Sequence, residues 1–454
     1  MKNKSKKIYI VGIEGAGTSA LAQIYKNFGH EVFGSDEGDH FYGDILKKAG
    51  IKVFEKFDAK NVPEDIDFAV YSTSNKEDNP EIIEIRKKRE IKLLQYSEAL
   101  GEIFSQKTGI AVCGTHGKTT TTALLAQVLK EGEKDPLALV GSKVIDWQSN
   151  VLLGQSEFFV AEADEYQNKL ALYNPWAVIL TSVDFDHPDF FADENEYKKV
   201  FVDFASKIPK TGFLVVWGDS ANTLEVAKNA KCEALTYGFG GDNDYIIKDF
   251  KSGEIQNFEI FEKEKSLGVF QTKLTGKHNA LNIAAAIVVS RKMKVDLEKT
   301  KQSLREFQGT VRRFQYVGQK NETIFIDDYA HHPDEIKATL AGARGKFADK
   351  KILVIFQPHT FSRTEALLSE FSQSFDDADT VWILDIYQSR EKIGNVSSRD
   401  LVDLINKYDR EKAEYISSIP DAVKLLGNES ENFDIVLTMG AGNVWEIGKE
   451  FLGK

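Results

Sequence analysis

Residues 112–120 read VCGTHGKTT, a glycine-rich segment between an apolar run that starts at Gly109 and a helical pattern at Ala123–Leu129. A glycine-rich turn at the start of a helix points several backbone N–H groups at one spot, and the helix dipole adds positive potential there. In such a loop Lys118 reaches the β- and γ-phosphates of a nucleotide, and the Thr119 hydroxyl ligates Mg²⁺. The segment predicts an ATP-binding loop of Gly114, Thr115, His116, Gly117, Lys118, Thr119 and Thr120.

The match to the usual phosphate-loop pattern is partial. GxxxxGK[ST] would place a glycine where Val112 stands, and the first glycine here is Gly114. An ordinary strand–turn–helix connection is the plain alternative. We also expect Lys118 to be an exposed side chain that contributes little to packing, since it starts a helix.

Strand-like runs alternate with helical patterns along the chain, which predicts an α/β protein with parallel sheets. The length of 454 residues exceeds what one hydrophobic core usually organises. We expect three domains, at residues 1–105, 106–309 and 310–454, with a β-rich edge at Thr236–Leu274. The predicted strands are Ile8–Val11, Glu31–Gly34, Ile51–Phe54, Phe68–Tyr71, Gly109–Val112, Phe158–Ala161, Ala177–Ser182, Phe213–Trp217, Ile324–Ile326, Ile352–Phe356, Thr380–Leu384 and Ile435–Thr438.

Acidic residues follow two of these strands, where ligands collect in open α/β sheets. The run Phe158–Ala161 leads into Glu162, the first acid of a cluster, and Ala177–Ser182 leads into Asp186 and His187. Mg²⁺ prefers oxygen ligands, so Glu162 is the better ligand for a metal at the phosphate loop. His187 offers a ring nitrogen to a second metal. Solvated acidic loops are the alternative interpretation.

The composition excludes several classes of protein. Lys plus Arg is 58 and Asp plus Glu is 70, a net charge of -12, which disfavours a protein that wraps nucleic acid. Cys113 and Cys232 have no CxxC partner, so no disulfide framework is expected. The first apolar stretch, Ile8–Val11, is too short for a signal peptide core or a membrane span. We expect a cytoplasmic protein, monomeric or homodimeric, with no membrane or nucleic-acid partner.

A series of motifs resembles the Mur ligase family, and it covers essentially the whole chain. A single motif of this kind would be weak evidence, but seven motifs occur here in the same order as in the family. The resemblance implies three domains: a Rossmann-like N-terminal one for a UDP-sugar, a central P-loop ATPase-like one with a parallel sheet, and a Rossmann-like C-terminal one for an amino acid. The motifs are Gly114–Thr120, Glu162–Glu165, Asp186–Asp189, Gly276–Asn279 with Asn282, Arg312–Phe314, Asp327–Pro333 and Gln357–Arg363.

The resemblance also implies a role for each matching residue. Lys118, Glu162 and His187 would be catalytic, with Thr119 and Glu162 on a first Mg²⁺ and His187 on a second. Asn279 and Asn282 would face the adenine of ATP, and Arg313 and Asp328 would contact ATP from the C-terminal domain. The amino-acid pocket would contain Tyr329, His331, His359 and Arg363.

The activity that the resemblance implies is ATP-dependent. Members phosphorylate the carboxylate of UDP-N-acetylmuramate to an acyl phosphate, which an amine then attacks. The segment Gln357–Arg363 favours L-alanine as that amine over a recycled murein tripeptide, because ligases for the tripeptide usually lack it. Two departures concern the amine: Tyr166-Gln167-Asn168 replaces a Ser-Asp pair, and Thr360 replaces an arginine found in many members.

The N-terminal segment Gly15–Ala20 fits GxGxxA after a strand, and Asp36 follows about twenty residues on. Alone, this pattern indicates an NAD-dependent dehydrogenase. That function would not explain the phosphate-loop residues Gly117-Lys118-Thr119. A catalytically silent nucleotide-binding protein would be expected to lack Lys118, Glu162 or His187. The same glycines also cradle the pyrophosphate of a UDP-sugar. The predicted UDP-sugar residues are Gly12, Gly15, Gly17, Ser35, Asp36, Ser72 and Asn79.

Overall fold

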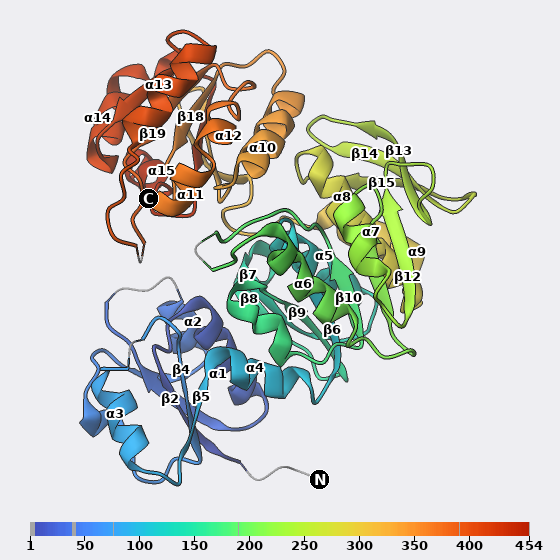
Figure 1. Ribbon diagram of the computed structural model, residues 1–454, viewed down its shortest axis with the longest axis vertical. Helices are drawn as coiled ribbons and strands as arrows, with labels where there is room; N and C mark the ends of the chain where they lie inside the picture. The colour runs from blue at the N-terminus through green and yellow to red at the C-terminus, as the bar shows by residue number, and fades with distance from the viewer. Residues whose placement is uncertain (1–4, 39–41, 76, 189, 390, 454) are drawn as a thin grey trace.

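The computed structural model describes residues 5–38, 42–75, 77–188, 190–389 and 391–453. The chain folds into three lobes that follow one another in sequence, each built around its own sheet (Figure 1). This confirms the predicted α/β class with three mainly parallel sheets. Within the described ranges, no helix is both long and apolar enough to cross a membrane.

The N-terminal lobe contains a five-stranded parallel sheet of order β3-β2-β1-β4-β5. The central strand β1 is buried almost throughout, as expected for a parallel strand covered on both faces. The strands are β1 (Lys7–Val11), β2 (Glu31–Ser35), β3 (Lys52–Phe54), β4 (Phe68–Tyr71) and β5 (Lys92–Gln95). The helices are α1 (Ala16–Asn27), α2 (Gly43–Lys48), η1 (Ala59–Asn61), α3 (Pro80–Lys87) and α4 (Tyr96–Phe104).

The central lobe has a ten-stranded sheet of order β15-β14-β13-β12-β11-β10-β6-β9-β7-β8. The predicted β-rich edge is confirmed, because β12 to β15 continue the sheet on one side. The strands are β6 (Thr108–Cys113), β7 (Leu137–Val144), β8 (Ser149–Leu153), β9 (Phe158–Glu162), β10 (Ala177–Leu180), β11 (Phe213–Trp217), β12 (Glu233–Gly238), β13 (Tyr245–Lys251), β14 (Gln256–Glu262) and β15 (Lys265–Thr272). The helices are α5 (Lys118–Glu131), η2 (Ile145–Trp147), η3 (Tyr166–Leu172), α6 (Glu194–Ala205), α7 (Ala221–Ala227), α8 (Lys277–Lys292) and α9 (Leu297–Glu306).

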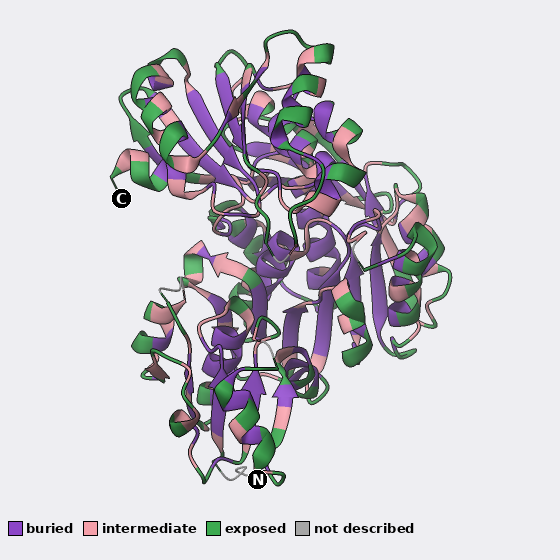
Figure 2. Cartoon of the chain, turned by 60° about the vertical axis from the view of Figure 1, so that its left-hand side comes forward, coloured by how far each residue is buried: buried purple, intermediate pink, exposed green. Residues whose placement is uncertain are grey.

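The C-terminal lobe has a six-stranded sheet of order β16-β17-β21-β18-β19-β20, in which only β16 pairs antiparallel. In each lobe the central strands are buried and the surrounding helices expose their outer faces (Figure 2). The strands are β16 (Gln315–Lys320), β17 (Thr323–Asp328), β18 (Ile352–Phe356), β19 (Thr380–Leu384), β20 (Ala413–Ile416) and β21 (Ile435–Met439). The helices are α10 (Pro333–Lys346), α11 (Phe361–Ala366), α12 (Leu368–Ser372), α13 (Ser398–Tyr408), α14 (Ile419–Glu429), η4 (Ser430–Asn432) and α15 (Glu446–Leu452).

Candidate active site

The glycine-rich segment forms the turn between β6 and α5, and its backbone requires glycine at two positions. Gly114 has φ 127°, and a Cβ there would lie 2.3 Å from the hydroxyl oxygen of Thr181. Gly117 has φ 78°, and a Cβ there would lie 2.4 Å from Oδ1 of Asn282. L side chains rarely adopt such positive φ values. The turn therefore has the geometry of an anion-binding loop that opens a helix.

The strand predicted at Ala177–Ser182 ends earlier, at Leu180. Thr181 instead donates its hydroxyl to the carbonyl oxygen of His116 at 2.5 Å, and the Ser182 hydroxyl accepts the backbone N–H of His116 at 3.0 Å. These two side chains form hydrogen bonds with the phosphate loop. The chain therefore stops pairing as a strand after Leu180, and the residues that follow support the loop that comes after the neighbouring strand β6.

Lys118 is not the exposed side chain that the sequence predicted. Its side chain is 16% exposed, and Nζ lies 3.0 Å from Oε2 of Glu165, whose side chain is only 1% exposed. Nζ also donates to the carbonyl oxygens of Gly114 and Thr115. Burial opposes the charge, but nearby carboxylates, Glu165 first, raise the pKa of Lys118 above its ordinary value. A charged amine is therefore held at the loop by a buried carboxylate.

Glu162 lies at the end of β9, against the first turn of α5. Its Oε1 accepts the Thr119 hydroxyl at 2.8 Å, and its Oε2 accepts the backbone N–H of Gly141 at 2.6 Å. Burial raises the pKa of Glu162. A hydroxyl and a carboxylate at a phosphate loop are the oxygen donors that Mg²⁺ prefers, so these residues fit the cation.

His187 lies beside two further acids. Asp164, Glu165 and His187 each offer one ligand atom, and these atoms all lie within 4.8 Å of one another. Burial lowers the pKa of His187, but Glu165 and Asp186 raise it above the ordinary value. The donor set again suits a cation, and the sequence analysis chose only His187 from it. Asp189, which ends this motif, lies outside the described residues.

The residues predicted for the amino-acid pocket lie together at the carboxyl ends of β17 and β18. The ring centroid of His331 is 5.3 Å from that of Tyr329 and 6.1 Å from that of His359. Burial lowers the pKa of His331 to about 3 and that of His359 to about 4, so both rings are neutral near pH 7. Nη1 of Arg363 lies 3.4 Å from Nδ1 of His359.

Arg363 also reaches across to the central lobe. Its Nη2 lies 3.1 Å and its Nε 3.3 Å from Oδ1 of Asp186, and both side chains are less than a tenth exposed. Although burial opposes it, Arg363 holds the pKa of Asp186 well below its usual range. Asp186 was quoted in a motif but given no role, and this buried pair joins the two lobes beside His187.

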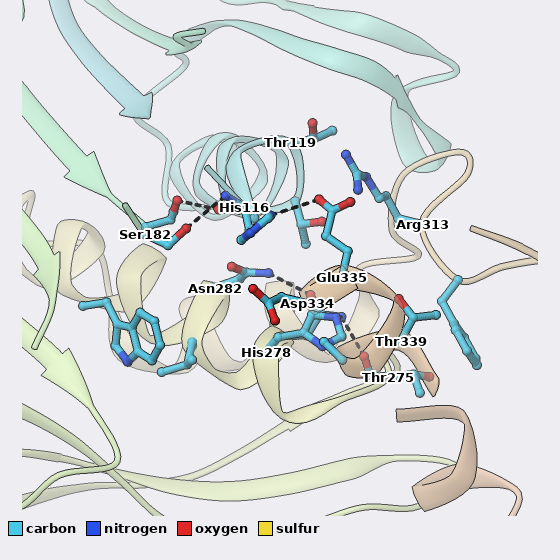
Figure 3. A pocket seen from close by; sticks show the side chains of 18 of the residues that line it. His116, Thr119, Ser182, Thr275, His278, Asn282, Arg313, Asp334, Glu335 and Thr339 are labelled. Atoms are coloured by element: carbon cyan, nitrogen blue, oxygen red, sulfur yellow. Dashed lines mark hydrogen bonds and ion pairs between the residues drawn. The ribbon is translucent and has the colours of Figure 1, made fainter. Parts of the chain in front are cut away.

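Two cavities open around the phosphate loop. The first, of about 320 Å³, takes walls from the central and C-terminal lobes, and in Figure 3 His116, Ser182 and Asn282 face Arg313 and Glu335 across it. Its lining includes most residues predicted to contact ATP: His116, Gly117, Thr119, Thr120, Asn279, Asn282, Arg313 and Asp328. It also includes Trp217 and His278, to which the sequence assigned no role, and these two side chains give the cavity a flat apolar wall and a half-buried imidazole ring.

Asp328 is held by its own lobe. Its carboxylate accepts the backbone N–H groups of Phe314 at 2.7 Å and Ala330 at 2.8 Å. Burial raises the pKa of Asp328 to about 6, against the opposing charge of Arg313. Asp328 thereby orders the loop that carries Arg313 into the cavity.

The second cavity, of about 700 Å³, lies on the other side of the loop. Its lining takes Tyr42 from the N-terminal lobe and Trp445 from the C-terminal one. It brings together predicted residues of three kinds: Thr115, Lys118 and Thr119 of the loop, Glu162 and His187 of the metal sites, and Tyr329 and His331 of the amino-acid pocket.

Four of the predicted UDP-sugar residues lie at one edge of the N-terminal sheet. Gly12 and Gly15 form the turn after β1, Gly17 lies in the first turn of α1, and Ser72 follows β4. Because β1 and β4 are parallel neighbours, these positions share the edge where ligands bind in open α/β sheets.

The other three have protein partners in this structure. Ser35 bonds the buried carboxylate of Glu81, Asn79 caps α3 through its side-chain oxygen, and Asp36 accepts the backbone N–H of Glu14 at 2.8 Å. None of the seven UDP-sugar positions lines either cavity. Their role stays a prediction.

Glu335 is the main functional candidate that the sequence analysis missed. It lies in the first turn of α10, where Oε2 accepts the backbone N–H of His331 at 3.0 Å and Oε1 lies 3.2 Å from Nδ1 of His116. Burial opposes ionisation, but His331 and His116 hold the pKa of Glu335 well below its usual range. Pro333 at the start of the helix and a glutamate two residues later are a capping signal, but this signal does not reveal the contact with His116.

Three domains of one protein family match consecutive parts of the chain. Residues 7–108 match the Mur ligase family catalytic domain, residues 112–290 the Mur ligase middle domain, and residues 312–442 the Mur ligase glutamate ligase domain. The chain is 41% identical over 455 residues to the UDP-N-acetylmuramate–L-alanine ligase of Caldanaerobacter subterraneus subsp. tengcongensis, covering 99% of this chain and 98% of the relative. It is 39% identical to the ligase of the same name from Desulfitobacterium hafniense, covering 98% and 99%.

Solved structures show the same likeness. The UDP-N-acetylmuramate-alanine ligase of Thermotoga maritima superposes with a TM-score of 0.83 at 27% identity, covering 99% of this chain and 98% of that one. The murein peptide ligase of Psychrobacter arcticus superposes with a TM-score of 0.73 at 23% identity, covering 99% and 98%, which shows a shared fold.

Proposed function

The chain belongs to the Mur ligase family, and on that basis we propose that it joins L-alanine to the lactyl carboxylate of UDP-N-acetylmuramate in an ATP-dependent reaction. Relatives of that name match it over nearly their full length. The dehydrogenase alternative is set aside, because all three family domains are those of ligases. We assign residues 1–105 to the UDP-sugar, 106–309 to ATP and 310–454 to the amino acid.

The observation that carries the proposal is the shared lining of the second cavity. Lys118, Glu162, His187 and His331 come from separate motifs and two lobes, yet all border one space of about 700 Å³. A ligase needs this arrangement, because the phosphate donor, the carboxylate that accepts the phosphate and the amine must meet at one point.

The residues divide the work by charge. A carboxylate is a poor electrophile, so ATP first phosphorylates it to an acyl phosphate, and the amine then displaces phosphate through a tetrahedral intermediate. Lys118 neutralises charge on the phosphoryl group, and Arg313 does so from the C-terminal lobe. Thr119 and Glu162 would hold one Mg²⁺ and His187 a second, and these cations would polarise the phosphoryl and carboxyl oxygens.

The substrate is tested by phosphate release with ATP, Mg²⁺ and UDP-N-acetylmuramate. We expect turnover with L-alanine, and weaker turnover with glycine and L-serine, since a pocket discriminates by about ten- to two-hundredfold per methylene. A thermal-shift measurement with NAD should show no binding. Preference for the L-Ala-γ-D-Glu-diaminopimelate tripeptide would instead make the chain a recycling ligase, with the ATP chemistry unchanged.

Glu162→Gln is expected to weaken the response to Mg²⁺ more than the contact with ATP. The amide keeps the side chain's size and can still accept the Thr119 hydroxyl, but it lacks the negative charge that binds a hard cation. Titration of Mg²⁺ at fixed ATP should show activity partly restored at high metal. Asp164→Asn is the matched comparison. If that variant shifts the Mg²⁺ curve and Glu162→Gln does not, the metal role belongs to the second acidic group.

A further inference from the structure

A second group of possible metal ligands lies where the phosphate loop meets the start of α10. His116 of the loop, His332 at the N-terminus of α10 and Asp334 in its first turn each offer one ligand atom, and these atoms lie within 4.8 Å of one another. The ring centroids of the two histidines are 5.1 Å apart. The group therefore joins the central and C-terminal lobes, and it shares no residue with the Mg²⁺ ligands proposed above.

His116 has the hydrogen-bonding pattern of a metal ligand. Nδ1 lies 3.2 Å from Oε1 of Glu335, a carboxylate that can only accept, so Nδ1 carries the proton. In the neutral ring Nε2 keeps its lone pair, and it is buried with no hydrogen-bond partner among the described residues. Burial opposes the charge, but Glu335 raises the pKa of His116, so a metal at Nε2 displaces a proton there. The nearest carboxylate oxygen in an ion pair with it, Oδ2 of Asp184, is 3.7 Å away. A carboxylate behind a histidine is the outer contact that usually orients such a ligand.

His332 provides a second ring that lacks strong partners. The residue is 6% exposed, and its Nε2 is also buried with no partner in the described part of the chain. Its Nδ1 accepts only a long bond of 3.4 Å from the backbone N–H of Asp334. Because Nδ1 accepts that N–H, the neutral ring carries its proton on Nε2, and Nδ1 holds the lone pair that a metal would take. A fully buried imidazole with both nitrogens weakly used or unused costs free energy unless a ligand engages it.

We propose that His116, His332 and Asp334 bind a divalent transition metal of the Zn²⁺ type, with Asp184 as a further carboxylate on the Nε2 side of His116. Two imidazoles and a carboxylate suit Zn²⁺ or Co²⁺, whereas Mg²⁺ prefers oxygen donors. Ligands of a tetrahedral zinc lie about 3.4 Å apart, so atoms that lie within 4.8 Å of one another need to approach by at most about 1.4 Å on binding. The exposed side chain of Asp334, 62% exposed, gives the metal a path in from solvent.

The site has a consequence for ATP. His116 and Asp334 both line the smaller cavity of about 320 Å³, where we place the nucleotide. A metal bound by this group links the phosphate loop to α10 and occupies part of the cavity. Zn²⁺ and ATP therefore compete, a point that rests on the proposed function, whereas metal binding itself does not.

The test measures Co²⁺ binding to the full chain by equilibrium dialysis and visible absorption, without ATP. Excess Mg²⁺ is present to fill the oxygen-rich sites. The wild type should bind one Co²⁺ with the intense spectrum of a tetrahedral site. His332→Asn keeps a side chain able to cap α10 but removes the ring, and Asp334→Asn changes a largely exposed group. Both should weaken Co²⁺ by about tenfold or more.

The matched controls are His30→Asn, on the N-terminal lobe, and His187→Gln, in the other group. Both should bind Co²⁺ like the wild type. Loss of binding in His187→Gln with normal binding in His332→Asn and Asp334→Asn would overturn the proposal, as would absence of tetrahedral Co²⁺ in the wild type. Titration of ATP into the Co²⁺ complex should bleach the spectrum. If Co²⁺ binds as proposed but ATP leaves it in place, the metal site stands and the position of ATP is wrong.

Discussion

Lys118→Ala is expected to reduce ligation by more than about a hundredfold, the scale seen when one preorganised electrostatic group is removed. The amine of Lys118 is charged and lies at the mouth of the phosphate loop, so it is placed to neutralise the transferring phosphoryl group. Phosphate release with UDP-N-acetylmuramate and L-alanine is the measurement. Near-normal turnover in a folded variant would remove this loop from the mechanism.

The structure adds a control that the sequence could not suggest. Lys118→Ala leaves the carboxylate of Glu165 buried without its cation, a change that costs about 3 to 5 kcal/mol in comparable buried pairs. Loss of activity could then come from unfolding. The double variant Lys118→Ala/Glu165→Gln removes the stranded charge, so thermal unfolding should recover while turnover stays low. Recovery of both would mean that Lys118 acts only through stability.

Local features were predictable because they depend on residues close together in the chain. The buried strand before Gly114 and the helix after Lys118 follow from an apolar run and a glycine-rich turn, and both are confirmed. The hairpin of β7 and β8 was missed, since Leu137–Leu153 includes a glycine and several polar residues that weaken a strand pattern. Thr181 and Ser182 were assigned to a strand because they directly follow an apolar run. Nothing in the local sequence shows that their hydroxyl groups form hydrogen bonds with the distant phosphate loop.

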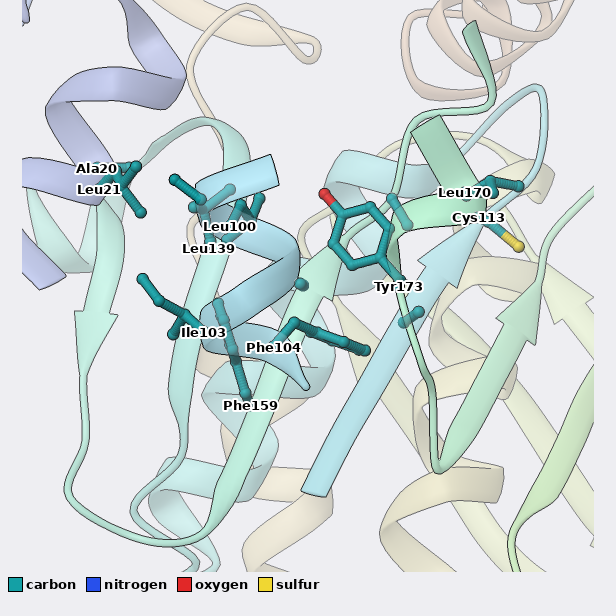
Figure 4. Packing of buried hydrophobic residues seen from close by; sticks show 14 of the residues in the cluster. Ala20, Leu21, Leu100, Ile103, Phe104, Cys113, Leu139, Phe159, Leu170 and Tyr173 are labelled. Atoms are coloured by element: carbon teal, nitrogen blue, oxygen red, sulfur yellow. The ribbon is translucent and has the colours of Figure 1, made fainter. Parts of the chain in front are cut away.

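Contacts between lobes could not be predicted from local sequence patterns. The N-terminal and central lobes were expected as separate domains, but their buried residues form one continuous cluster, in which α1 and α4 pack onto the central strands. Figure 4 shows Leu100, Ile103 and Phe104 of α4 among side chains of β7 and β9. Likewise His116 meets Glu335 from 219 residues away. No periodicity encodes such pairings, because they are set by how complete lobes dock.

The last prediction concerns Arg363, and we propose that its guanidinium binds the carboxylate of the amino acid. Arg363→Lys keeps the charge that the buried carboxylate of Asp186 requires, but it loses the planar fork. We expect KM for L-alanine to rise by about tenfold or more, with little change in KM for ATP. In this structure Nε and Nη2 serve Asp186, which leaves Nη1, near His359, as the donor turned to the amino-acid side.

Asp186→Asn separates this role from a purely structural one. Asp186→Asn removes the negative charge beside Arg363 but keeps the guanidinium and its planar fork. If Arg363 binds the substrate, Asp186→Asn should therefore change KM for L-alanine much less than Arg363→Lys does. If Arg363 only joins the lobes, both variants should weaken the pair of buried charges and raise KM for ATP and L-alanine together, since the proposed ATP site lies between the same two lobes. Steady-state kinetics of both variants with each substrate varied in turn distinguish the two outcomes. Equal effects on both substrates would take Arg363 out of the amino-acid pocket and leave Tyr329, His331 and His359 to form it.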